Sequence, residues 1–371
     1  MPGHYRNLAS RVQYRGSSKE MRQFTSVSAL FAAAASLACG QTLLTLPEAS
    51  QRAVVTQRIG VSDVTITYHR PLVNGRKVWG GIVPYDQVWR AGANENTTIA
   101  FSDPVAVEGQ PLAKGTYGLH MMPGTDTWTV IFSKASTAWG SFSYKQAEDS
   151  LRVTVKPQPA EFHEALTYDF DDVKPDSAVV TLRWEKLAVP FRVSTDEKEI
   201  TLESLRTQLR GGVQYTWEGW AEAADYCLTS KTDLDEGLRW ADRSIAVEER
   251  FDNVMLKSQL LDALHRDTEA TAAKTHALEL ANVTQLYFFA RQLQAQKQPA
   301  QAMDVFRQVA RRYPEHWLGH MAVARLSSST GDYTKAIQEI KIVQGLGVPE
   351  QQKANLEALL RRLEAQQDIN Q

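Results

Sequence analysis

One polar loop that runs directly into a strand organises the first half of the chain: Pro84-Tyr85-Asp86-Gln87-Val88-Trp89-Arg90-Ala91-Gly92-Ala93-Asn94-Glu95-Asn96-Thr97-Thr98-Ile99. Charged side chains are buried without a large cost only when they are paired. In one interpretation, Arg90 and Glu95 pair with each other and with loop backbone, and the loop closes one end of a domain. In the other, these side chains converge on a ligand, since arginine binds a carboxylate or a phosphate through two parallel hydrogen bonds.

Short stretches of alternating apolar and polar residues lie on both sides of this loop. Val64, Ile66 and Tyr68 are separated by polar residues, which is the period of two expected of a half-buried strand. Residues 116–132 repeat this pattern around a Pro-Gly turn and predict a hairpin. Eight or nine such strands, with no helical spacing between them, predict an all-β antiparallel sandwich for residues 41–193.

The pattern changes to helical spacing after residue 193. Three apolar positions recur at an offset of 34 residues (336 − 302 = 34): Ala302, Phe306 and Val309 are matched by Ala336, Ile340 and Val343. This offset is the period of tetratricopeptide repeats, which residues 217–364 resemble. We therefore expect an all-α tetratricopeptide-like array of three to four stacked helix pairs. A helical linker at 194–216 precedes it, and a polar tail at 365–371 is expected to fray.

Seven motifs stand out in the first domain: Tyr68–Pro71, Asn74–Gly80, Val83–Tyr85, Val88–Glu95, Lys114–Tyr117, Trp128–Phe132 and Leu182–Glu185. Together they resemble the bacterial family catalogued as domain of unknown function 2911, over nearly the whole first domain. The resemblance implies a secreted or envelope-located bacterial protein, often joined to helical repeats. It implies no reaction and supplies no catalytic residues.

The N-terminal segment has the features of a secretory signal. Met21-Arg22 is followed by an apolar run from Val27 to Ala38 and then by Gly40, after which cleavage is expected. The run is too short to span a bilayer, which takes about 20 apolar residues. Residues 1–40 are therefore interpreted as an upstream extension and a signal peptide, with the true start at Met21. This pattern predicts a periplasmic or secreted protein without a transmembrane helix.

The two cysteines bear on processing and on redox chemistry. Lipoprotein processing at Cys39 is the alternative to cleavage after Gly40 and would leave a lipid anchor, although Ser36 stands where such a site usually has leucine. In both cases Cys227 is the one thiol left for pairing in the exported chain. An intramolecular disulfide and a thiolate metal cluster are therefore excluded.

The candidate ligand-binding residues lie in and near the polar loop: His69, Trp79, Trp89, Arg90, Asn94, Glu95 and His120. Either tryptophan could stack on a sugar or an aromatic ring, and either histidine could act as a general acid or base. The sequence contains no nucleophile elbow, phosphate-binding glycine loop or complete zinc motif. We therefore predict no catalytic residue, cofactor or metal site. A net charge of −2 argues against a nucleic-acid partner.

The leading hypothesis is a non-catalytic interaction protein of the cell envelope. Its array would hold a protein or peptide partner, and its sandwich would bind a small ligand or serve as a packed module. The alternative is a hydrolase-like or ligand-binding enzyme that uses the Arg90–Glu95 loop. An enzyme should show a cleft with His69 or His120 within hydrogen-bonding distance of Glu95. An interaction protein should show a filled loop and an open, apolar-lined groove in the array.

Overall fold

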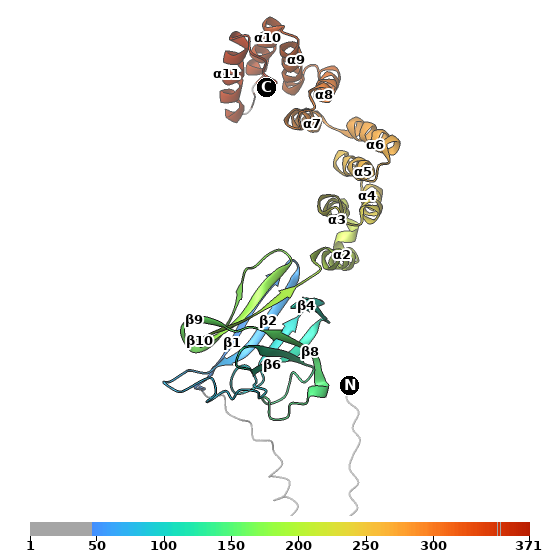
Figure 1. The fold of residues 1–371 in the computed structure, drawn as a ribbon. Helices are drawn as coiled ribbons and strands as arrows, with labels where there is room; N and C mark the ends of the chain where they lie inside the picture. Colours follow the sequence, from blue (N-terminus) through green and yellow to red (C-terminus); the bar gives the residue numbers. More distant parts are fainter. Residues whose placement is uncertain (1–46, 347, 349) are drawn as a thin grey trace, which may run out of the picture. The chain divides into compact units, whose positions relative to one another are not determined.

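The computed structural model describes residues 47–346, 348 and 350–371 (Figure 1). The predicted signal peptide and the possible anchor at Cys39 lie outside these residues. Strands occupy the chain as far as Ser194, and helices follow from Glu197 onward. None of the helices in the described part combines the length and the apolar character that a membrane crossing requires.

Two antiparallel sheets form the first domain, which confirms the predicted all-β sandwich. The larger sheet has the order β1-β2-β3-β6-β7-β8 and the smaller one β5-β4-β10-β9. The strands of the larger sheet are β1 (Gln51–Ile59), β2 (Ser62–Arg70), β3 (Thr98–Phe101), β6 (Gly115–Pro123), β7 (Trp128–Ser133) and β8 (Asp149–Val155). Those of the smaller sheet are β4 (Val105–Val107), β5 (Gln110–Leu112), β9 (Gln158–Asp171) and β10 (Ser177–Ser194). A short 3-10 helix, η1 (Gln146–Glu148), precedes β8.

The alternation of apolar residues places one face of each sheet in a shared core. Along β2, Val64 and Ile66 are fully buried while the residues between them are half-exposed. The β6–β7 hairpin forms as predicted, with Met121 opposite Val130. Large side chains from both sheets fill the core, among them Trp128, Phe132, Trp184 and Phe191. Burying each of them stabilises the fold by roughly 1.5–3 kcal/mol before entropy is counted.

Ten α-helices follow in the described part of the chain, and they confirm the predicted helix-pair array. Four antiparallel pairs are α3 (Trp217–Ser230) with α4 (Leu234–Val247), α5 (Phe251–Ala263) with α6 (Asp267–Leu280), α7 (Val283–Ala295) with α8 (Pro299–Arg312), and α9 (Trp317–Ser329) with α10 (Tyr333–Gly345). The remaining helices are α2 (Glu197–Gln208) and α11 (Glu350–Glu364), and η2 (Gly212–Tyr215) is a 3-10 turn.

The 34-residue offset corresponds to the second helices of two successive pairs. Ala302, Phe306 and Val309 on α8 are completely buried, and so are Ala336, Ile340 and Val343 on α10. All six belong to one apolar cluster. Asp233, Asn282 and Asp332 begin their helices by accepting a hydrogen bond from a backbone N–H three residues on, which satisfies a donor that the helix itself cannot.

Both ends of the array contribute buried side chains. Leu202 on α2 and Leu209, the residue that follows this helix, are buried in the same cluster as side chains of α3 and α4. In the tail expected to fray, Ile369 is 2 % exposed. The buried Arg325 donates to the Ile369 carbonyl at 2.9 Å. A buried guanidinium requires acceptors, and the tail supplies one.

Candidate functional site

The polar loop is held in place by backbone hydrogen bonds to β6. The N–H of Trp89 donates to the carbonyl of Met121 at 2.8 Å, and the Met121 N–H donates to the Trp89 carbonyl at the same distance. The loop thereby continues the pairing that β3 makes with the first half of β6. Neighbouring residues in such a pairing point to opposite faces. Trp89 and Met121 therefore turn toward the core, whereas Arg90 and His120 lie on the outer side.

A buried tyrosine secures the tight turn that follows Arg90. Ala91 has a φ of 49°, in the left-handed region that alanine ordinarily avoids. The hydroxyl of Tyr168 donates to the Ala91 carbonyl at 2.9 Å. At Gly92, a Cβ atom would lie 2.5 Å from the Thr97 Oγ1 atom, so only glycine fits there. The loop is thus a fixed part of the sandwich.

Four tryptophans form one aromatic cluster beneath the loop. The ring of Trp79 lies 4.9 Å from Trp128, 5.7 Å from Trp184 and 6.1 Å from Trp89. Trp79 is only 9 % exposed, so the expectation that it stacks on a ligand is not met, because other indoles cover it. Trp89 is half-buried, stacks on Trp184 and donates its indole N–H to the Gly92 carbonyl.

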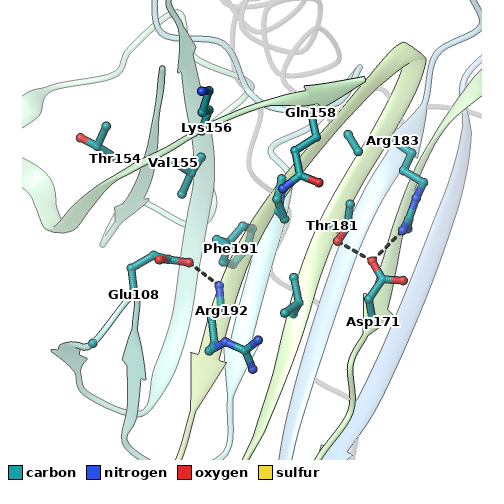
Figure 2. A pocket seen from close by; sticks show the side chains of 14 residues that line it. Glu108, Thr154, Val155, Lys156, Gln158, Asp171, Thr181, Arg183, Phe191 and Arg192 are labelled. Carbon is teal, nitrogen blue, oxygen red and sulfur yellow. Dashed lines mark hydrogen bonds and ion pairs between the residues drawn. The ribbon is translucent and has the colours of Figure 1, made fainter. Parts of the chain in front are cut away.

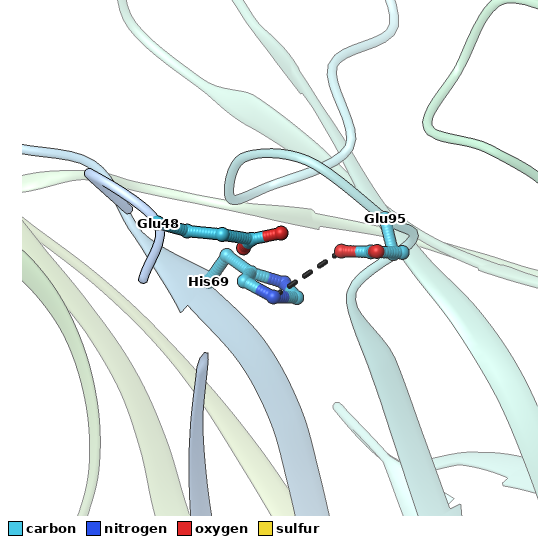
Figure 3. Close-up of side chains that lie close together, drawn as sticks. All are labelled: Glu48, His69 and Glu95. Atoms are coloured by element: carbon cyan, nitrogen blue, oxygen red, sulfur yellow. Dashed lines mark ion pairs between the residues drawn. The ribbon is translucent and has the colours of Figure 1, made fainter. Parts of the chain in front are cut away.

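The expected Arg90–Glu95 pair does not form. Glu95 contacts His69 instead, with its Oε2 atom 3.2 Å from Nε2 of the imidazole (Figure 3). Arg90 donates from Nη1 to the backbone carbonyl of Asn94, so the predicted contact with loop backbone is present. The His69–Glu95 contact is the one expected of the enzymatic alternative. A small cavity lies beside Arg90, and neither His69 nor Glu95 lines it. The loop therefore divides into two separate environments.

Arg90 lies against the segment that joins β7 to β8. Its guanidinium carbon is 5.0 Å from the ring centre of Phe142, a cation–π contact. Gly140 has a φ of 62°, and a Cβ atom there would lie 2.7 Å from the guanidinium carbon. The close approach of backbone to Arg90 therefore requires this glycine. Burial lowers the pKa of Arg90 from its ordinary value, which shows that the charge is partly removed from water.

His120 is buried on the outer face of β6 and meets Ser141. Its Nδ1 atom is 2.8 Å from the Ser141 Oγ atom. Burial, and then the charge of Arg90, lower the pKa of His120 to about 4, so the imidazole is neutral at pH 7. The ring of Tyr144 packs edge-on against it at 5.5 Å. The Tyr144 hydroxyl in turn donates to Asp149 at 2.6 Å, and burial raises the pKa of this tyrosine to about 12.

Arg90 and Ser141 border a small cavity. It has a volume of about 270 Å³ and is lined by Pro84, Gln87, Val88, Trp89, Arg90, Ser141 and Phe142. One cation, one hydroxyl and one amide line it together with four apolar side chains. This is the mixture of an apolar surface with a few placed polar groups that small-molecule sites share.

The residues contributed by the segment between β7 and β8 were not predicted from the sequence. Ser141, Phe142 and Tyr144 lie in no recognisable motif, and Ser141 reaches His120 from 21 positions away in the chain. Asn96 was also missed, although its amide donates to the Ala135 carbonyl at 3.0 Å and so fastens this segment to the loop. The one available signal was a group of aromatic residues in a stretch without strand or helix period.

A larger cavity of about 640 Å³ lies between β8, β9 and β10 (Figure 2). Most of its charged groups already have partners. Asp171 accepts hydrogen bonds at 2.6 Å from both Thr181 and Arg183. Glu108 accepts one from the backbone N–H of Arg192. Lys156 also lines the cavity. Since Asp171, Arg183 and Glu108 are engaged, the cavity offers a charged ligand less than its size suggests.

The array contains a groove lined by the first helices of three successive pairs. Its volume is about 400 Å³. The lining residues come from α3 (Ala221, Glu222 and Asp225), α5 (Phe251, Asp252, Met255, Leu256 and Gln259) and α7 (Phe289 and Gln292). Stacked helix pairs characteristically present such a surface on one side. This is the apolar-lined groove expected of an interaction protein.

Comparison with protein families assigns the sandwich. Residues 50–193 match the family described as "Protein of unknown function (DUF2911)". The match confirms the resemblance inferred from the seven sequence motifs, and its description names no reaction. No curated protein matches this sequence.

Two of the solved structures that align with part of the chain are tetratricopeptide-repeat proteins. One is YrrB, described as a tetratricopeptide-repeat protein with an unusual peptide-binding site; it is 12 % identical, with 44 % of this chain and 84 % of YrrB covered, and the TM-score is 0.27. The other is a tetratricopeptide-repeat protein from Parabacteroides merdae; it is also 12 % identical, with 46 % and 67 % covered, and the TM-score is 0.29. At these scores neither likeness supports an argument about the function of this chain.

Proposed function

We propose that this chain is an exported, non-catalytic interaction protein whose helical array takes up a segment of a protein partner. The groove lined by α3, α5 and α7 carries the proposal. A peptide that enters such a groove buries apolar side chains while its polar groups meet those along the walls.

The floor of the groove is apolar and preformed. Phe251 and Phe289, from neighbouring pairs, meet edge to face with their ring centres 6.1 Å apart. Both rings are half-buried, so each retains surface that a partner side chain can cover. Met255 and Leu256 lie beside them and are 7 % and 8 % exposed. Aromatic and methionine side chains of this kind are enriched where proteins bind one another.

The walls of the groove carry negative charge. Glu222, Asp225 and Asp252 are exposed and line it, and no lysine or arginine is among its ten lining residues. Gln259 and Gln292 add amide groups that can pair with peptide backbone. A fitting partner segment therefore combines lysine or arginine with an aromatic or aliphatic side chain, since complementary charge steers association and suppresses unlike partners.

Selection from a random peptide display library tests this proposal. We expect the full-length chain to enrich peptides that pair basic with apolar residues. Asp225→Lys should weaken the selected peptides about tenfold or more, because it replaces an attraction with a repulsion at close range. Asp304→Lys on the exposed surface of α8 is the matched control and should bind like the parent. Enrichment of acidic peptides, or equal affinity for both variants, would reject the proposal.

Export is supported by the sequence between Met21 and Gln41, which has the features of a secretory signal. Cys227 is buried, and burial and neighbouring carboxylates raise the pKa of its thiol to about 11, so it is poorly reactive. Mass spectrometry of the processed N-terminus distinguishes the possibilities. Cleavage after Gly40 leaves Gln41 first, whereas a lipidated Cys39 indicates an envelope anchor. A chain that keeps residues 1–40 would contradict export.

A second candidate function, a hydrolase-like activity, is favoured by the 2.8 Å contact between Ser141 and His120. This is the spacing of a nucleophile and its base. The low pKa of His120 makes the imidazole a weak base at neutral pH, which is why binding is the preferred function. Covalent labelling of Ser141 by a fluorophosphonate, absent in His120→Asn, would support the activity. An unlabelled Ser141 would dismiss it.

A further inference from the structure

We propose that the cavity bordered by Arg90 and Ser141 binds a small monocarboxylate that has an apolar body. The site is lined by other residues than the partner groove, so the proposal goes beyond the function assigned to the array. Four observations support it: the charge state of Arg90, the neutrality of its neighbours, the apolar wall and the size of the cavity.

Arg90 is a cation that lacks a carboxylate partner within the described residues. It contacts the Asn94 carbonyl, the ring of Phe142 and the backbone at Gly140, and no glutamate or aspartate of the described residues forms an ion pair with it. Other arginines of the sandwich, such as Arg183 and Arg192, do meet aspartates. A half-buried charge without a counter-ion is costly. A carboxylate entering the cavity would remove that cost.

The guanidinium keeps donors for such a ligand. Arginine has five N–H donors in a planar fork, and the Asn94 carbonyl engages Nη1. A carboxylate matches the fork because two parallel hydrogen bonds can form. Gly140 packs against the guanidinium, and the ring of Phe142, which is 82 % exposed, lies beside it, so two contacts restrict its freedom. A donor that is already partly ordered loses less freedom on binding.

The neighbours of Arg90 fix the preferred ligand charge at −1. His120 is neutral at pH 7, and Ser141 carries no charge. Asp149 and Arg152 lie behind Tyr144, where they face each other at 3.6 Å, and neither lines the cavity. The lining therefore has one positive charge. A phosphate monoester, with a charge of about −1.5 to −2, would bring charge that this lining does not neutralise.

The wall and the size of the cavity restrict the rest of the ligand. Pro84, Val88, Trp89 and Phe142 supply an apolar surface. The volume of about 270 Å³ lies just below the range of about 300–1,000 Å³ that drug-sized ligands occupy, so a single ring or a short branched chain fits best. Ser141 adds a hydroxyl beside the cation. Its hydrogen bond with His120 fixes where that hydroxyl points.

Calorimetric titration of the full-length chain with benzoate, phenylacetate and 4-methylpentanoate tests the site. At least one of the three should bind. Its neutral amide should bind about tenfold or more weakly, because a hydrogen bond to a charged group contributes more than one between neutral groups. Phenyl phosphate should also bind more weakly than benzoate or phenylacetate. Absence of binding by all three acids, or equal binding of an acid and its amide, overturns the proposal.

Variants locate the site. Arg90→Met removes the charge at similar length and should abolish measurable binding. Gln87→Glu changes an exposed lining residue and should reduce affinity about tenfold or more, since its carboxylate competes for Arg90. This second variant keeps the test decisive if Arg90→Met unfolds. Arg58→Met, at an exposed arginine paired with Asp63, is the control and should bind normally. Unchanged affinity in Gln87→Glu would refute the assignment.

Discussion

The sandwich and the helical array carry excess charge of opposite sign at their candidate sites. In the sandwich, Arg90 is half-buried beside a small cavity whose other lining residues are neutral. In the array, three carboxylates line an open groove without a lysine or arginine among the lining residues. The first arrangement holds its charge in a rigid frame, and the second displays its charge to solvent. The difference indicates that the two domains select ligands of opposite charge and by different means.

The largest effect is expected from a substitution in the tryptophan cluster beneath the polar loop. Trp79→Ala should lower the free energy of unfolding of the sandwich by roughly 3–5 kcal/mol, because it leaves a cavity between three other tryptophans. The control is Trp139→Ala, since Trp139 is 60 % exposed. Calorimetry should show the sandwich transition move while the array transition stays. If both transitions moved together, the two domains would not be energetically separate.

A second effect depends on pH and tests the neutral surroundings of Arg90. The folded pKa of His120 is about 4, below the ordinary value of 6.5. Between these pH values His120 is protonated in the unfolded chain and neutral in the folded chain. The free energy of unfolding therefore falls as the pH falls from about 6.5 to about 4. The loss should reach about 3 kcal/mol.

Chemical denaturation at several pH values measures this loss, and His120→Asn supplies the reference. The asparagine side chain at position 120 cannot titrate, whereas Arg90, Tyr144 and the acidic residues are present in both proteins. The difference in slope between the two proteins therefore isolates His120. Parallel pH profiles would show that the imidazole is not held neutral.

A smaller effect is expected where the loop is tied to the smaller sheet. Tyr168→Phe removes the hydroxyl that donates to the Ala91 carbonyl and leaves that buried acceptor unsatisfied. The expected cost is about 1–2 kcal/mol. Tyr168 also contributes ring packing against Tyr68, which phenylalanine preserves. If Tyr168→Phe left the free energy of unfolding unchanged, the turn at Ala91 would need no hydrogen bond from outside the loop.

The smallest effect on stability is expected in the array, at the carboxylates that line its groove. Asp225→Lys should change the free energy of unfolding by no more than about 0.5 kcal/mol, since Asp225 is exposed and its change disturbs no core contact. Denaturation of the parent and the variant under one buffer condition checks this. Substantial destabilisation would indicate that the carboxylate serves the fold rather than a partner.

Patterns that repeat along the chain were predictable from the sequence. Alternation in β2 and the offset of 34 residues between Phe306 and Ile340 each follow from which side chains face a core. Such patterns depend on local geometry, so they are visible in one sequence. They located both domains and the polar loop. They did not show that Ile369 would be buried, because it is a lone apolar residue in a polar segment.

The pairing of the candidate residues was not predictable in the same way. Arg90 and Glu95 are five positions apart, yet Glu95 meets His69 on β2, and Arg90 meets a segment that follows β7. These choices depend on how strands distant in sequence are brought together. The left-handed conformations of Ala91 and Asn94 turn the two side chains to different environments. No periodicity reports a backbone conformation of that kind.

The stack of Trp89 on Trp184 has a practical consequence. Their ring centres are 5.9 Å apart and their planes differ by 20°. Indoles so close together absorb light as a coupled pair, so their near-ultraviolet circular dichroism differs from that of isolated chromophores. One member belongs to the loop and the other to β10. Loosening of the loop should therefore change the near-ultraviolet circular dichroism of the protein, and no attached dye is needed to detect it.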